Sequence, residues 1–127
     1  MNIKLAVVGS RSITNHDPIF NKLDQYMEIA SKTNREIIIV SGGASGVDTI
    51  AAEFARNRGL ILINVLPAWN DKYGNYIRSA GFKRNDIIWE VCDCGVAFWD
   101  GKSKGTAHSF DLAKQYKKRL AIIEVKS

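Results

Sequence analysis

The sequence predicts an α/β fold in which an open, mostly parallel sheet of about five strands lies between two layers of helices. Short apolar runs rich in β-branched residues alternate along the chain with segments whose apolar residues recur at helical spacing. No tight hairpin turn joins neighbouring runs, so right-handed crossovers between parallel strands are expected. The 127 residues are 46% hydrophobic and 24% charged. This composition is typical of one globular domain, which is expected to span residues 1–127.

Each strand is expected from an apolar run that polar segments bound on both sides. The runs are Ile3 to Val8, Ile37 to Val40, Leu60 to Leu66, Gly95 to Phe98 and Leu120 to Val125. Continuous apolar runs of this length are typical of parallel strands that are buried on both faces.

Helices are expected between these runs, and several have terminal signals. Asp17 before Pro18 predicts an N-cap followed by the first helical residue, and Thr106 predicts a second N-cap. Gly59 is expected to close a helix. The helical segments run from Ile19 to Ala30, from Val47 to Ala55, from about Phe82 to Val91 and from Thr106 to about Lys117.

The stretch from Pro67 to Gly81 has no clear period and is long for a connection in an α/β domain. It contains Trp69, Tyr73 and Tyr76, and three large aromatic residues argue against disorder. An ordered loop near the ligand is therefore expected.

The charge balance favours anionic partners without choosing among nucleic acid, nucleotide and phosphate. Lys and Arg total 18 against 13 Asp and Glu, which gives a net charge of +5. No apolar stretch approaches the ~20 residues of a membrane span, and the first residues lack the apolar region of a signal peptide. A cytoplasmic protein without a membrane partner is expected.

Several functional classes are disfavoured by what the sequence lacks. Cys92 and Cys94 form a Cys-x-Cys pair without further ligands, so neither a disulfide framework nor a metal site is expected, and no cofactor is expected. The two thiols are interpreted as small core-facing or strand-start residues. The chain has no Walker A loop and no Gly-x-Gly-x-x-Gly fingerprint, which disfavours ATP hydrolysis and conventional dehydrogenase chemistry.

Polar and glycine-rich segments follow three of the expected strands. They are Gly9 to Arg11, Ser41 to Asp48, and Trp99 to Thr106. In an open parallel sheet, ligands bind beyond the carboxyl ends of the strands, near the point where strand order reverses. Glycines at the start of a following helix leave N–H groups free to face an anion. We therefore expect two phosphate-binding turns, one at Gly42 and Gly43 and one at Gly105 and Thr106.

Four other side chains admit both a structural and a functional interpretation. Asp48 either complements the helix dipole or contacts a ribose or base. His108 either touches a ligand or faces water. Trp99 is a better candidate for base stacking than Trp69, since aromatic residues in a long loop more often hold that loop to the domain.

Several separated motifs, in order, resemble the SLOG superfamily and its YspA-like branch. They are Gly9-Ser10-Arg11, Ser41 to Asp48, Ala68-Trp69 with Lys72-Tyr73-Gly74, Ala80-Gly81 with Arg84-Asn85, and Ala97 to Gly101 running on to Gly105-Thr106. The superfamily includes the Lonely Guy phosphoribohydrolases and the single-stranded-DNA-binding DNA processing protein A. The resemblance implies a Rossmann-like three-layer fold and a nucleotide-type ligand, and it favours a homo-oligomer.

One position departs from the pattern of the phosphoribohydrolases, whose glycine turn is followed by a glutamate that assists cleavage of the N-glycosidic bond. Ser109 stands where the resemblance places that glutamate. A neutral hydroxyl neither stabilises an oxocarbenium ion by charge nor acts as a general base near neutral pH. No catalytic residue is assigned, although Asp48, Glu90 and Asp100 are candidate substitutes.

The leading hypothesis is a module that binds a nucleotide or an NAD-derived, ADP-ribose-like molecule, as a sensor or to sequester it. An N-glycosidase acting on nucleoside 5'-monophosphates is the second hypothesis, and single-stranded nucleic acid binding is the third. Arg11, Lys102 and Lys104 would neutralise phosphate charge. The expected ligand-binding residues are Gly9, Ser10, Arg11, Gly42, Gly43, Ala44, Asp48, Arg84, Asn85, Trp99, Lys102, Lys104, Gly105 and Thr106.

Overall fold

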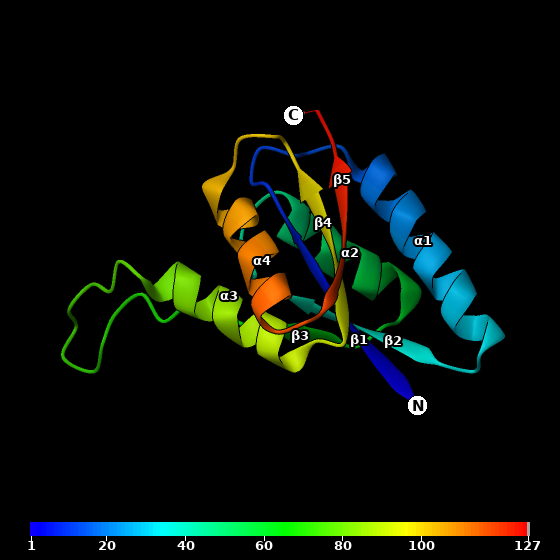
Figure 1. Ribbon diagram of the computed structural model, residues 1–127, viewed down its shortest axis with the longest axis horizontal. Coiled ribbons are helices and arrows are strands. Elements are labelled where there is room, and N and C mark those ends of the chain that lie inside the picture. Colours follow the sequence, from blue (N-terminus) through cyan, green and yellow to red (C-terminus); the bar gives the residue numbers. More distant parts are fainter. Residues whose placement is uncertain (127) are drawn as a thin grey trace.

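The computed structural model describes residues 1–126 and contains one five-stranded parallel sheet (Figure 1). The strands are β1 (Asn2–Gly9), β2 (Glu36–Ser41), β3 (Leu62–Asn64), β4 (Cys94–Trp99) and β5 (Arg119–Glu124), in the order β3-β2-β1-β4-β5. The helices are α1 (His16–Lys32), α2 (Val47–Arg58), α3 (Ala80–Val91) and α4 (Lys104–Gln115). The predicted α/β fold with five parallel strands is confirmed.

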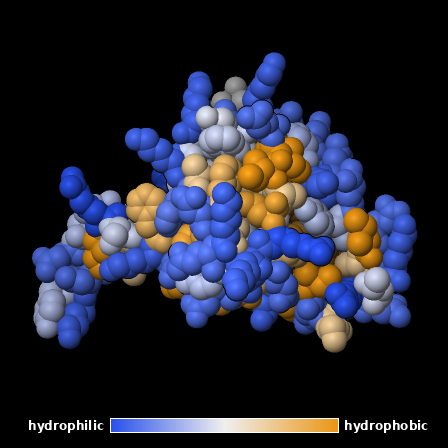
Figure 2. Space-filling view, viewed as in Figure 1, coloured by the Kyte–Doolittle hydropathy of each residue, from blue (hydrophilic) through white to orange (hydrophobic). Residues whose placement is uncertain are grey.

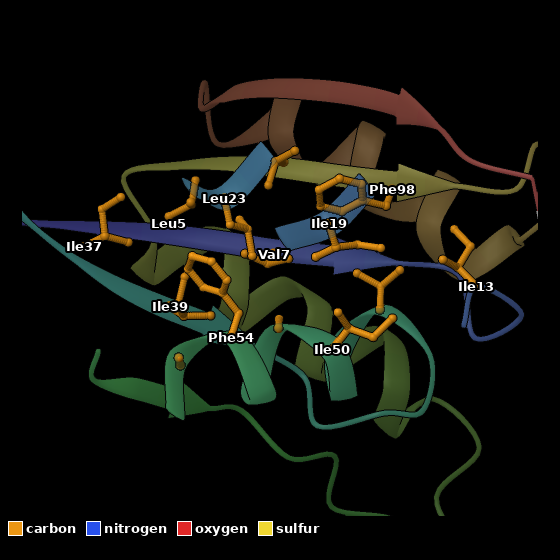
Figure 3. Packing of buried hydrophobic residues seen from close by; sticks show 14 of the residues in the cluster. Leu5, Val7, Ile13, Ile19, Leu23, Ile37, Ile39, Ile50, Phe54 and Phe98 are labelled. Carbon is orange, nitrogen blue, oxygen red and sulfur yellow. The ribbon is translucent and has the colours of Figure 1, made fainter. Parts of the chain in front are cut away.

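The sheet separates two apolar clusters. On one face, residues of α1 and α2 such as Ile19 and Phe54 pack against Leu5, Val7 and Ile39 of the sheet (Figure 3). On the other face, residues of α3 and α4 pack against the alternate side chains of the same strands. Burial of each strand on both faces explains why the strand sequences are continuously apolar.

The ends of several elements differ from the sequence expectation. Asp17 is not the N-cap of α1: Asn15 caps it, because the Asn15 side-chain oxygen accepts a hydrogen bond from the Asp17 amide at 3.1 Å. Pro18 therefore lies inside the first turn, where a missing N–H costs nothing. Thr106 is likewise not an N-cap, since the Ser103 hydroxyl accepts from the Thr106 amide at 3.4 Å.

The bounds of β3, α3 and α4 also differ from the sequence expectation. The third strand is shorter than predicted, α3 begins at Ala80 rather than Phe82, and α4 ends at Gln115. Lys117 cannot extend α4 because it has a left-handed φ of 55°.

Gly59 closes α2 in the left-handed conformation, as predicted. Cys92 is buried at the end of α3, and burial raises the pKa of its thiol to about 11, which agrees with the structural interpretation.

The segment from residue 67 to residue 79, called the arm below, projects from the body next to the start of α3 (Figures 1 and 2). Its two sides are joined by an antiparallel bridge between Asn70 and Tyr76 and by a hydrogen bond from the Ile77 amide to the Trp69 carbonyl at 2.6 Å. Asp71 holds the tip, since its carboxylate accepts from the amides of Tyr73 and Asn75. The arm is thus a short, internally bonded hairpin.

No helix within residues 1–126 is long and apolar enough to cross a membrane.

Candidate functional site

A cavity of about 470 Å³ lies beyond the carboxyl ends of β1 and β4. The chain turns to opposite sides of the sheet at these two strands, which is where ligands bind in open parallel sheets. Its volume is within the range of small-molecule sites. It is lined by Val8, Gly9, Arg11, Ser12, Ala44, Asp48, Arg84, Asn85, Asp100, Ser103, Gly105, Thr106 and Ser109.

Most of the predicted site residues meet at this cavity, although they come from four separate parts of the chain. The predicted residues that line it are Gly9, Arg11, Ala44, Asp48, Arg84, Asn85, Gly105 and Thr106. Gly42 and Gly43 instead line a neighbouring cavity of about 260 Å³, together with Arg11, Ala44 and Arg84. The two cavities therefore adjoin.

Four predicted residues do not line either cavity. Ser10 is fully buried, and its hydroxyl accepts from the Asp100 amide at 3.0 Å. Trp99 is held away because its Nε1 donates to the Ser103 carbonyl at 3.1 Å and its ring packs edge-to-face on Phe110. Lys102 and Lys104 are exposed and line neither cavity.

Arg84 on α3 lies between the two cavities. Its Nη1 donates to the Gly42 carbonyl at 2.6 Å and its Nε donates to the Asn85 side chain at 2.8 Å. A Cβ atom at Gly42 would lie 2.5 Å from Nη1 of Arg84, so any side chain there would displace the guanidinium. Within residues 1–126, Nη2 of Arg84 has no hydrogen-bond acceptor. This almost buried guanidinium remains charged and retains donors for an anionic ligand.

Asp48, in the first turn of α2, is the buried carboxylate of the cavity. Its Oδ2 accepts from the Ala44 amide at 3.1 Å, so it closes the loop that precedes its own helix. Burial raises the pKa of Asp48, while the Ala44 amide and the charges of Arg84 and Arg11 act in the opposite direction. Asp48 therefore orders the loop before α2 and also lines the cavity.

Asp100 is a second carboxylate at the cavity. Its side chain accepts from the hydroxyl of Ser12 at 2.7 Å and from the amides of Lys102 and Ser103, each at 2.8 Å. These hydrogen bonds hold the pKa of Asp100 far below its ordinary value of 3.8. Asp100 is therefore ionised at neutral pH, with its acceptors directed at the loops after β1 and β4.

The first turn of α4 forms the open wall of the cavity. A helix leaves its first N–H groups without intrahelical partners, and the helix dipole places partial positive charge there. Apart from its chain neighbours and the nearby backbone of α4, no heavy atom lies within 4 Å of the position that a Cβ atom of Gly105 would occupy. Thr106 and Ser109 of the same helix are buried beneath this opening.

Sequence reasoning missed Val8, Ser12 and Ser103 as lining residues and gave Asp100 and Ser109 no binding role. The signal available for Asp100 was its place directly after β4, and for Ser12 its place in the loop after β1. The sequence did not decide whether His108 touches a ligand or faces water. In the structure its ring packs edge-to-face on Phe82, with 4.6 Å between the ring centroids, and it does not line the cavity. No group of three or more His, Cys, Asp or Glu side chains in residues 1–126 is arranged to hold a metal ion.

Known structures share this fold. DNA processing protein A from Helicobacter pylori, whose structure concerns its single-stranded DNA binding mode, has 26% identity and a TM-score of 0.68, with 94% of this chain and 64% of that chain covered. The corresponding protein from Streptococcus pneumoniae has 23% identity and a TM-score of 0.70, with 94% and 50% covered. TM1055 has 20% identity and a TM-score of 0.65, with 93% and 72% covered. This chain thus spans less than two thirds of either DNA processing protein.

Sequence comparison identifies the family. No curated protein matches the chain. Residues 3–71, which include β1, β2, the glycine-rich loop after β2 and the beginning of the arm, match the YspA, cpYpsA-related SLOG family. The match covers more than half of the 127 residues. The chain therefore belongs to the YspA, cpYpsA-related SLOG family.

Proposed function

We propose that residues 1–127 act as one domain that binds a phosphorylated small molecule, a nucleotide or an NAD-derived compound, as a sensor or to sequester it. The observation that carries this proposal is the convergence of Arg11, Arg84 and the open first turn of α4 on one cavity at the carboxyl edge of the sheet. Cationic side chains and free helical N–H groups together favour a phosphate.

The arrangement favours binding over hydrolysis. Ser109 lines the cavity at the position where the family resemblance places a catalytic glutamate in the phosphoribohydrolases. Asp100 accepts hydrogen bonds from the protein's own loops, and Asp48 accepts one from Ala44, so both carboxylates already stabilise structure. Because both carboxylates already accept hydrogen bonds from the protein, neither is favoured as the general acid or base of a hydrolysis reaction.

Titration calorimetry with nucleoside mono- and diphosphates, NAD and ADP-ribose tests the proposal. We expect Arg84→Gln to weaken phosphate-dependent binding by about 10-fold or more, because a charge-assisted hydrogen bond from a buried donor is lost. Lys83→Gln is the matched control, since Lys83 is the adjacent exposed cation on α3. Absence of binding at millimolar ligand concentration contradicts the proposal. Release of free base, detected by mass spectrometry, would instead support the hypothesis that the protein is an N-glycosidase.

Single-stranded DNA binding is a second candidate function. It is favoured by the similarity to the Helicobacter pylori protein over 94% of this chain and by the net charge of +5. Fluorescence anisotropy of labelled oligonucleotides at several salt concentrations tests it, because release of counterions makes such binding fall steeply with salt. No binding at low salt removes this candidate.

A further inference from the structure

We infer that the second, smaller cavity is a subsite for a flat ring, such as a nucleobase, and that Trp69 is its specificity-determining residue. This inference rests on the proposed function and adds the position of the ring and the residue that selects it. A molecule carrying both a phosphate and a ring would then bind more tightly than its ring-free counterpart.

The two cavities share part of their lining. Arg11, Ala44 and Arg84 line both, so a ligand with its phosphate in the larger cavity would reach the smaller one by extending past Arg84. A guanidinium plane at such a junction suits both parts of a nucleotide, since it pairs with phosphate and stacks on aromatic rings.

The lining of the two cavities differs in chemistry. The larger one contains carboxylates and hydroxyls, whereas the smaller one is walled by Leu66, Pro67 and Trp69 and by the backbone of Gly42 and Gly43. Apolar side chains and backbone that lacks side chains suit an apolar ring better than a charged group. Inorganic phosphate or a sugar phosphate would leave these walls uncovered.

The arm fixes Trp69 while leaving it accessible. The Trp69 ring stacks on Tyr76 with a centroid distance of 5.9 Å and an interplanar angle of 12°. The Ile77 amide donates to the Trp69 carbonyl across the hairpin. Even so, 37% of Trp69 and 66% of Leu66 remain exposed, next to the cavity that both residues line. A bound ring would cover this apolar surface, which gives the internally bonded arm a binding role.

The experiment compares three probes by calorimetry: AMP, ribose 5-phosphate and adenosine. For the unmodified protein we expect AMP to bind at least about 10-fold more tightly than ribose 5-phosphate, because stacking of one base on an aromatic side chain is worth this much or more. We expect Trp69→Ala to remove that advantage and to leave the affinity for ribose 5-phosphate unchanged. Trp69→Phe, which keeps a ring, should restore most of it.

Two further variants separate this role from a general loss of structure. Tyr73→Ala alters the exposed tip of the same arm. Because Tyr73 lines neither cavity, this variant should leave the affinity for AMP unchanged. Leu66→Ala removes another apolar wall of the smaller cavity and lies outside the arm, so it should lower the affinity for AMP but not for ribose 5-phosphate. Tryptophan fluorescence gives an independent signal, since the change on AMP binding should disappear in Trp69→Phe.

The outcomes distinguish this inference from the proposed function. If ribose 5-phosphate and AMP bind equally well, or if Trp69→Ala weakens both to the same extent, the ring subsite is wrong while the phosphate site stands. If neither compound binds the unmodified protein, nor any other phosphorylated probe, the proposed function fails and the subsite fails with it. Retained AMP preference in Trp69→Ala also overturns the assignment.

Discussion

The two glycine-containing loops at the carboxyl edge of the sheet look alike in sequence and differ in structure. The loop after β2 is closed by the protein's own groups: its Gly42 carbonyl accepts from Arg84 and its Ala44 amide donates to Asp48. The first turn of α4, which contains Gly105, lines the cavity and has open space beside that glycine. A glycine-rich turn after a parallel strand therefore indicates only that the chain turns sharply there. The contacts that the turn makes with the rest of the protein decide whether an anion can reach its N–H groups.

The two loops also hold their carboxylates in opposite electrostatic environments. Burial raises the pKa of Asp48 in the first, whereas hydrogen bonds lower the pKa of Asp100 in the second. The loop that leads into α2 is therefore packed around a buried carboxylate, whereas the loop that leads into α4 is held by a carboxylate that accepts several hydrogen bonds.

The largest effect is expected for Gly46→Ala in the first loop. Gly46 has a φ of 75°, and a Cβ atom there would lie 2.5 Å from the Ser10 carbonyl oxygen and 2.6 Å from the Cα atom of Arg11. Because these are backbone atoms, the loop after β1 and the start of α2 must move apart. We expect a loss of roughly 3 kcal/mol of unfolding free energy, measured by urea denaturation. A loss below about 1 kcal/mol would show that the first loop is not tightly constrained.

Asp100→Asn in the second loop should lower stability at neutral pH. Asparagine keeps one side-chain oxygen, so it cannot accept hydrogen bonds both from the Ser12 hydroxyl and from the amides of Lys102 and Ser103, and it carries no charge. Since the pKa of Asp100 is lower in the folded state, its stabilising contribution is present above pH ~5 and is lost as the pH falls below 3.8. The stability difference between the variant and the unmodified protein should shrink in acid, and a difference that grows in acid contradicts this account.

Asp48→Asn should show the opposite dependence on pH. Because burial raises the pKa of Asp48, the folded state binds this proton more tightly than the unfolded chain. Stability conferred by Asp48 therefore falls as the pH rises from 3.8 through the folded-state pKa and stays low above it. An asparagine keeps an acceptor for the Ala44 amide and removes that loss, so the variant should match or exceed the unmodified protein at pH 7. Denaturation midpoints at pH 4 and pH 7 provide the measurement.

The fold could be predicted from the sequence because its cause is local and repetitive. Continuous apolar runs, as at Val7 and Ile39, require burial on both faces, and the crossover rule then leaves few arrangements. The N-caps were misplaced because Asn15 and Ser103 compete with Asp17 and Thr106, and the choice between such neighbours depends on geometry that spacing does not contain.

The site could be predicted only in part for a different physical reason. Strand ends bring Arg11, Asp48 and Gly105 together by topology alone. Trp99 and the lysines of the second loop lie in the same segment, yet hydrogen bonding to Ser103 turns the indole away, and Lys102 and Lys104 extend into solvent. Direction of a side chain within a loop is set by contacts from other segments, which a single sequence does not show.

The smallest effect on stability is expected for Gly105→Ala, and it gives the sharpest comparison between the loops. The added Cβ would meet no other part of the protein within 4 Å, apart from its chain neighbours and the nearby backbone of α4. Because alanine is also favoured over glycine in a helix, we expect a gain of up to about 1 kcal/mol in urea denaturation. The new methyl group would nevertheless occupy space in the cavity that Gly105 lines. Phosphate-dependent binding should therefore weaken while stability rises. Such opposite changes cannot arise from damage to the fold, so they would assign the open turn to the ligand, whereas unchanged affinity would place the phosphate elsewhere in the cavity.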